Sequence, residues 1–201
     1  MEHVLDSVKS IKQLINRDQE AAFETLLNTS TADSGMDCGS SGALQLLVLC
    51  LLLPSYEVVS MTITILLALS FSSKHGDTFT LLLSQTSTFQ VFQHAMMFEI
   101  QTYSDNTANT KSAQKAKQQG SLLEDYVVIL QKATAKDVTG LVSQELDGRL
   151  VEGLNQVVNY VDGGAAADQE NIDGQQSRAS VDHQNVFLSQ NIKSILRFIA
   201  S

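Results

Sequence analysis

The sequence predicts an all-α fold in which short helices stack against one another. Two apolar runs, 43–53 and 61–71, are separated by a turn at Pro54, which is the pattern of two packed helices. Segments 3–15 and 137–161 place apolar residues at helical spacing and polar residues on the opposite face. Because such helices cannot bury their apolar surface alone, we expect them to pack against neighbours of the same kind.

The composition fits one domain with an acidic surface. The 201 residues are enough for a single domain or one short helical array, so we expect 1–201 to form a single helical-repeat domain. The formal net charge of -9 repels phosphate backbones, and we expect no direct binding to nucleic acid. The same charge attracts basic peptides or the basic faces of other proteins.

The cysteines and the N-terminus favour the cytoplasm or the nucleus. Neither Cys38 nor Cys50 belongs to a Cys-x-x-Cys pair, and the first residues lack the apolar core of a signal peptide. We therefore expect both thiols to be reduced. A membrane span is disfavoured, because 43–53 and 61–71 are each about 16 Å long as helices, roughly half of the ~30 Å hydrocarbon core. A membrane-associated helical protein stays as an alternative.

The first part of the chain begins with two helices and continues with the apolar pair. The amphipathic segment 3–15 forms the first helix, and Asp18 can cap a second helix that contains residues 21–27. The segment 28–41 is polar and has no period, so we expect a flexible loop there. The apolar pair at 42–73 follows this loop.

Residues 77–104 repeat this layout in a weaker form. We expect a short helix or turn at 79–83, followed by a longer helix with an apolar inner side. That inner side comprises Phe89, Val91, Phe92, Ala95, Met96, Phe98 and Ile100. β-Branched alternation at 62–65 and 78–81 leaves strands as an alternative in this part of the chain.

Polar segments separate the remaining helices. Segments 104–119 and 163–183 contain few apolar residues, and we expect flexible loops or insertions there. The expected helices are, in order, 122–130, 137–161 and 186–199. The second of these is expected to break near Gly140 and to end at 162–164, where two glycines can take the left-handed cap.

Residues 42–73 resemble one armadillo repeat. Gly42-Ala43-Leu44-x-x-Leu47-Val48-x-x-Leu51-Leu52 looks like its second helix, and Pro54-Ser55-x-Glu57-Val58-Val59 resembles the turn into its third. Leu67-Ala68-Leu69-Ser70 resembles the motif that closes the third helix, as does Ile195-Leu196-Arg197-Phe198-Ile199-Ala200-Ser201. The resemblance implies a short right-handed α-solenoid of armadillo- or HEAT-like repeats with polar insertions. It also implies a non-enzymatic scaffold or adaptor.

Members of this family hold an extended peptide in a groove lined by third-helix residues, with asparagines gripping the peptide backbone. Ser70 and Phe198 stand where those asparagines would be, which argues against nuclear-signal recognition of the importin kind. The resemblance still implies a protein partner, with a basic or amphipathic segment. The polar positions expected to line its binding surface are Gln90, His94, Gln101, Glu152, Gln156 and Asn159.

The titratable residues form no pattern typical of catalysis or metal binding. The four histidines never pair at ligand spacing, and we expect His75 at the surface and His94 half-buried. The acidic segment 168–174 resembles a calcium loop, but Ala179 stands where the twelfth-position Glu is required. Neither a nucleophile elbow nor a phosphate-binding loop occurs in the sequence. We therefore expect no enzyme, no cofactor and no metal site.

Two further functions stay open beside the interaction module. The chain can be a structural subunit of a larger assembly, including a viral or organellar one, because the ends of a short helical array need caps or partners. It can also be an enzyme whose polar groups converge from separate loops. An enzyme of that kind would require a closed pocket that holds two perturbed carboxylates.

Overall fold

The computed structural model describes residues 2–28, 42–108, 113–136, 141–167 and 178–200. Every regular element in these ranges is a helix, which confirms the predicted all-α class. None of the helices in the described part combines the length and the apolar character that crossing a bilayer requires. The chain clusters into two compact units, 1–95 and 96–201. That 1–201 forms one domain stays a prediction.

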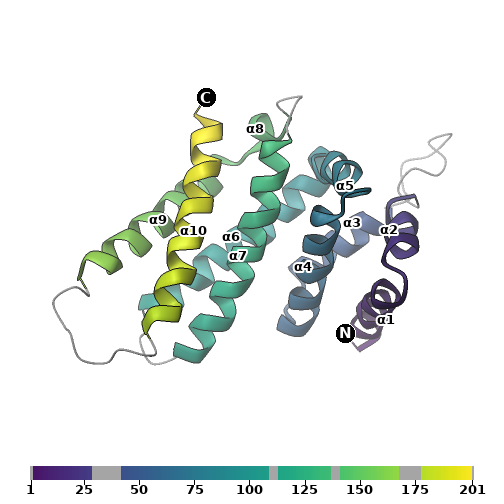
Figure 1. Cartoon of the computed structure of the whole chain (residues 1–201), viewed down its shortest axis with the longest axis horizontal. Coiled ribbons are helices and arrows are strands. Elements are labelled where there is room, and N and C mark those ends of the chain that lie inside the picture. The colour runs from purple at the N-terminus through teal and green to yellow at the C-terminus, as the bar shows by residue number, and fades with distance from the viewer. Residues whose placement is uncertain (1, 29–41, 109–112, 137–140, 168–177, 201) are drawn as a thin grey trace. The chain divides into compact units, whose positions relative to one another are not determined.

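The first unit is built around α4 (Tyr56–Phe71) (Figure 1). This helix packs against α1, η1 and α5, while α2 packs against α1 and α3. The other elements are α1 (Glu2–Arg17), α2 (Gln19–Asn28), α3 (Ala43–Leu49), the 3₁₀ helix η1 (Cys50–Leu52), α5 (Gly76–Leu83) and the first part of α6 (Thr86–Ala108). Val58, Ile63 and Leu66 of α4 are fully buried, so α4 forms the core of this unit.

The second unit is held together by α10 (Arg178–Ile199), which packs against both α7 and α9 (Figure 1). Its other elements are the last part of α6, α7 (Ala113–Ala135), α8 (Leu141–Glu145) and α9 (Gly148–Ala167). Leu123, Tyr126 and Leu130 of α7 are buried, as are Leu188, Ile192 and Ile195 of α10. These residues recur every three or four positions, which is the period of a helix buried on one face.

The turn between α1 and α2 follows the prediction for Asp18. The Oδ1 atom of Asp18 accepts a hydrogen bond from the backbone N–H of Ala21 at 3.1 Å. This bond satisfies one of the backbone donors that the start of α2 leaves without an intrahelical partner. The predicted N-cap is therefore confirmed.

The apolar pair at 42–73 is also confirmed, as α3–η1 followed by α4. Helix α3 tightens into a 3₁₀ turn at Cys50, and Leu53 before Pro54 is extended, with φ -77° and ψ 143°. Proline restricts the residue that precedes it in this way, which ends the first helix. The strand alternative at 62–65 and 78–81 is wrong, because both segments are helical and tertiary burial outweighs a weak strand preference.

The inner face of α6 differs from the prediction at Phe98, and Val91 is only half-buried. Phe89, Phe92, Met96 and Ile100 are buried as expected, but Phe98 is 68% exposed. At 100° per residue, Phe98 lies about 160° around the helix from Ile100, so it cannot share the buried face. The position of Phe98 in the helical period, and not its apolar side chain, therefore decides its exposure.

The predicted amphipathic helix at 137–161 is divided at a point that was not predicted. The break lies between Glu145 and Gly148, where Asp147 caps α9, and the predicted break near Gly140 lies outside the described residues. Helix α9 also continues through Gly163 and Gly164 to Ala167 instead of ending there. Glycine permits a helix end without requiring it, and the alanines that follow are strong helix formers.

The predicted insertions are more helical than expected. Helix α6 continues to Ala108 and α7 begins at Ala113, so most of 104–119 is helical. Helices α9 and α10 likewise extend into both ends of 163–183. Polar residues such as Gln and Lys favour exposed helical turns, so the lack of apolar residues did not indicate a loop. Of 28–41, residues 29–41 lie outside the described part, as do 109–112 and 168–177.

Candidate functional site

The six residues predicted to bind a partner are all exposed. Gln90 and His94 belong to the first unit, whereas Gln101 of α6 and the three residues of α9 belong to the second. His94 is therefore more exposed than the half-buried position expected for it. The residues that can act together within one unit are Gln101, Glu152, Gln156 and Asn159.

The polar face of α9 carries three of these residues. Glu152, Gln156 and Asn159 follow one another at spacings of four and three, which places them on one exposed side of the helix. On the opposite side Leu150, Leu154, Val157 and Val161 are buried. The amphipathic sequence of α9 therefore fixes which face contacts the core and which face meets solvent.

Both ends of this polar face are anchored by an aspartate. At the start of α9, Oδ1 of Asp147 accepts a hydrogen bond from the backbone N–H of Arg149 at 2.8 Å, which caps the helix. Near its end, Oδ2 of Asp162 lies 2.8 Å from Nζ of Lys193, and Oδ1 accepts a hydrogen bond from Oγ of Ser189 at 2.9 Å. The bonds from Lys193 and Ser189 lower the pKa of Asp162. Helix α9 is thereby tied to α10.

Helices α6 and α9 approach each other closely at a glycine. A Cβ atom placed on Gly153 would lie 3.2 Å from Cγ2 of Ile100, which is tighter than most such contacts. Glycine at this position therefore permits the close approach of the two helices. Gln101 and Glu152 adjoin these two residues in the sequence, and the exposed Phe98 lies three residues before Gln101 on α6.

Ionisable side chains of α6, α7 and α9 gather in the same unit. Burial raises the pKa of Glu99 on α6 and of Asp125 on α7. Burial also raises the pKa of Tyr126, and the charge of Glu99 raises it further. The pKa of Tyr103 is raised by burial and then by the nearby Tyr160 and Glu124. Since no group of three or more His, Cys, Asp or Glu in the described part of the chain could hold a metal ion, this cluster is acidic without being a metal centre.

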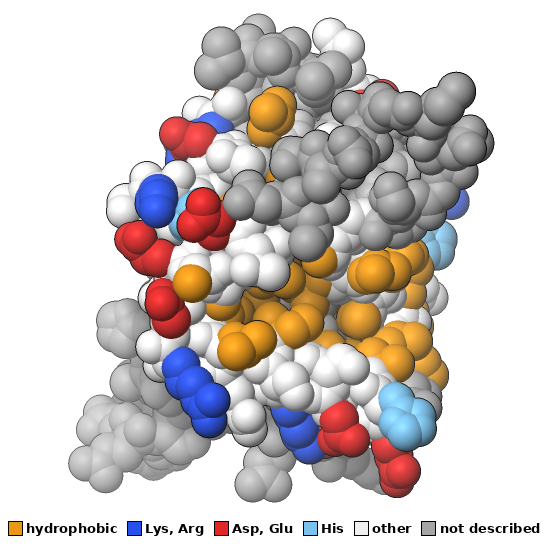
Figure 2. Space-filling view, turned by 90° about the vertical axis from the view of Figure 1, so that its right-hand side faces the viewer, with side chains coloured by type: hydrophobic (Ala, Val, Ile, Leu, Met, Phe, Trp, Pro, Cys, Tyr) orange, Lys and Arg blue, Asp and Glu red, His pale blue; other side chains and the backbone are white. Residues whose placement is uncertain are grey.

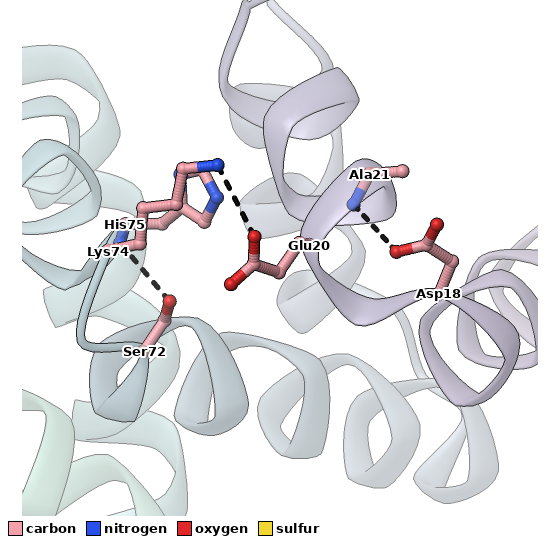
Figure 3. A network of polar contacts seen from close by, with 6 residues as sticks. All are labelled: Asp18, Glu20, Ala21, Ser72, Lys74 and His75. Atoms are coloured by element: carbon pink, nitrogen blue, oxygen red, sulfur yellow. Dashed lines mark hydrogen bonds and ion pairs between the residues drawn. The ribbon is translucent and has the colours of Figure 1, made fainter.

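His75 lies in the turn between α4 and α5 of the first unit (Figure 3). Only 8% of His75 is exposed, so the prediction of a surface histidine is wrong. Its ring meets Phe23 edge-on at a centroid distance of 6.3 Å, and its backbone N–H donates to Oγ of Ser72 at 3.1 Å. Beside it, Nζ of Lys74 lies 3.3 Å from Oε2 of Glu20. The polar neighbours of His75 indicated a surface turn, whereas its apolar partner lies 52 residues away in the sequence.

Two candidate nucleophilic or basic groups lie in the described part of the first unit, on His75 and Cys50. The buried Nε2 atom of His75 has no hydrogen-bond partner among the described residues, so no base or acid is paired with it. Burial raises the pKa of the Cys50 thiol, which donates a hydrogen bond to the carbonyl oxygen of Leu46 at 3.3 Å. A raised pKa keeps the thiol protonated and poorly nucleophilic at neutral pH. Cys38 lies outside the described residues.

The chain matches no family model, no curated protein and no solved structure.

Proposed function

We propose that this protein is a non-enzymatic scaffold or adaptor that binds a basic or amphipathic segment of a partner protein. In this proposal the helices form a short right-handed solenoid of armadillo- or HEAT-like repeats, and the protein acts in the cytoplasm or the nucleus without a cofactor. The observation that carries the proposal is the exposed face of α9, where Glu152, Gln156 and Asn159 are held in line by anchors at both ends.

The chemistry of this face suits a basic segment. Glu152 supplies a negative charge, and the amide groups of Gln156 and Asn159 can donate to and accept from a peptide backbone. On α6, the exposed ring of Phe98 offers a surface on which a lysine or arginine cation can rest. Because α9 is fixed by its N-cap and by Asp162, little conformational entropy is lost when a partner binds.

A charge reversal at Glu152 tests this proposal. The probe is a labelled peptide of alternating lysine and proline, which stays extended and cannot form a helix. We expect the intact chain to bind it at low salt, and Glu152→Lys to bind several-fold more weakly because an attraction becomes a repulsion. Fluorescence anisotropy measures the affinity, and circular dichroism checks that the fold is unchanged.

Glu2→Lys is the matched control, since Glu2 is an exposed glutamate on α1 of the first unit. It makes the same change in net charge and should affect binding far less. Equal weakening by both variants would mean that the peptide senses only the net charge, and unchanged binding in Glu152→Lys would mean that the α9 face is not the site. Leu154→Asp, at a fully buried position, should unfold the chain. It serves as the reference for a loss of binding that is caused by unfolding.

A second candidate function is a subunit of a larger assembly. Val186 and Phe187, two neighbouring apolar residues of α10, are both about half exposed. In this second proposal a neighbouring subunit covers this apolar pair. Light scattering of the purified chain distinguishes the two candidates, because a stable, soluble monomer would disfavour an obligate subunit.

A further inference from the structure

A row of exposed leucines runs along α3 and η1 in the first unit. Leu46, Leu49 and Leu52 are 55%, 43% and 45% exposed. They are spaced three residues apart, and the 3₁₀ turn at Cys50–Leu52 brings Leu52 into line with Leu49. Leu44, Leu47, Val48 and Leu51 of the same segment are buried, so this segment is apolar on both faces. We call Leu46, Leu49 and Leu52 the leucine row.

The leucine row is uncharged, and α2, which packs against α3, is acidic. Residues 43–52 contain no charged side chain. Helix α2, which contacts α3, carries Glu20 and Glu24 and no lysine or arginine, and Asp18 caps it. Figure 2 views the first unit from the side of α1 and α2 and shows apolar side chains gathered in a hollow with charged side chains around it.

The whole first unit carries the same sign of charge. Residues 1–95 contain nine Asp and Glu against four Lys and Arg, which gives a net charge of -5. Lys9 and Lys74 are engaged in ion pairs with Glu57 and Glu20. A partner that docks on the leucine row therefore meets an apolar surface within an acidic field.

We propose that the leucine row is a docking site for an amphipathic helix of a partner protein, with an apolar face and lysines or arginines along its edge. The apolar face would cover Leu46, Leu49 and Leu52, as in helix-in-groove recognition. The basic edge would lie toward Glu24 and the other acids of α2. This site belongs to the first unit and is independent of the polar face of α9.

A second copy of this chain fits the surface less well than a basic helix does. Two copies meeting through their leucine rows would bring two acidic α2 helices together, and like charges oppose such an interface. Three half-exposed leucines also supply far less than the roughly 800 Å² per partner that stable dimers bury. A single helix needs a smaller contact and brings the complementary charge.

Three labelled peptides of about five helical turns test the proposal on the full chain. The first has a leucine face and lysine edges, the second has the same leucine face with glutamate edges, and the third is a scramble of the first. We expect only the first to bind tightly, the second to bind at least about tenfold more weakly, and the scramble to show no saturable binding. Equal binding of the first two peptides would overturn the assignment of a basic partner.

The variant Leu46→Gln/Leu49→Gln should weaken binding of the first peptide at least about tenfold, because contacts at the centre of an interface carry most of its affinity. Leu81→Gln, at an exposed leucine of α5, is the control and should bind like the wild type. Circular dichroism shows whether each variant folds. The proposal is overturned if the double variant binds the first peptide as tightly as the wild type does. It is also overturned if the wild-type chain is a dimer and the double variant is a monomer. The lysine-proline peptide used for α9 should bind the double variant normally, so failure of one proposal is distinguishable from failure of the other.

Discussion

Single residues in this protein carry charge where the packing disfavours it. Glu99 lies on α6 and Asp125 on α7 of the second unit, and burial raises the pKa of both carboxyl groups. Asp162 behaves in the opposite way, because Lys193 and Ser189 stabilise its charged form. The same residue type therefore stabilises or destabilises the fold according to its partners, and the pH dependence of stability distinguishes the two cases.

We predict that Glu99→Gln stabilises the chain at neutral pH. The raised pKa means that the folded chain holds this proton to higher pH than the unfolded chain does, so stability decreases as pH rises through the two pKa values. Glutamine is neutral at every pH and avoids this loss. The urea midpoint of the variant should exceed that of the wild type at pH 7.

The difference in urea midpoint between Glu99→Gln and the wild type should vanish at a pH well below the ordinary pKa of glutamate. There the carboxyl group of Glu99 is protonated in both the folded and the unfolded chain. Glu24→Gln, at an exposed position, is the control and should change the midpoint little at any pH. A lower midpoint for Glu99→Gln at neutral pH would mean that the charge of Glu99 is stabilised in the folded chain.

The helices are positioned by their ends as much as by their faces. Asp18 and Asp147 each accept a hydrogen bond from a backbone N–H at the start of a helix. Pro54 separates the apolar pair, while Gly153 lets α9 approach Ile100 of α6. The apolar face of a helix decides which side is buried. The capping residues decide where a helix begins, and Gly153 decides how near α9 lies to α6.

We predict that Asp147→Ala destabilises the chain by about 1 kcal/mol, the usual cost of losing an N-cap side chain. The backbone N–H of Arg149 would lose the acceptor that it now has at 2.8 Å. Urea denaturation measures the change in the free energy of unfolding. Asp147→Ser is the control, because serine can also cap a helix and should retain most of the stability.

The molecule as a whole carries an excess of negative charge. Its net charge is -9, and the ion pairs Lys9–Glu57, Lys74–Glu20 and Lys193–Asp162 each join two segments of one unit. These pairs neutralise a few carboxylates locally and leave the rest to repel one another. Exposed pairs contribute little stability, so we expect the unbalanced charge to dominate the response to salt.

We predict that moderate salt stabilises the chain at pH 7. Between about 0.01 M and 0.15 M ionic strength the Debye length falls from about 30 Å to about 8 Å, which screens repulsion among the surface carboxylates. The urea midpoint should therefore rise with sodium chloride. Near the isoelectric point, at a pI of about 4.7, the same titration should leave the midpoint nearly unchanged. A midpoint that falls at pH 7 would mean that the ion pairs outweigh the repulsion.

The sequence by itself determined the elements that depend on neighbours along the chain. The helical period predicts α1, α9 and the apolar pair, because residues three and four apart share a helix face. The capping role of Asp18 is equally local, since its hydrogen bond reaches only three residues ahead. The exposure of Glu152, Gln156 and Asn159 likewise follows from the period of α9.

Only the tertiary structure decided which side chains meet across long sequence distances. His75 is buried because Phe23 covers it, and Asp162 is fixed by Ser189 and Lys193, which lie 27 and 31 residues further along the chain. The leucine row is exposed because no other helix of the described part covers that face of α3 and η1, although its residues are as apolar as the core. The physical reason is that hydrophobicity favours burial without specifying a partner, and the partner is selected only when the whole chain packs.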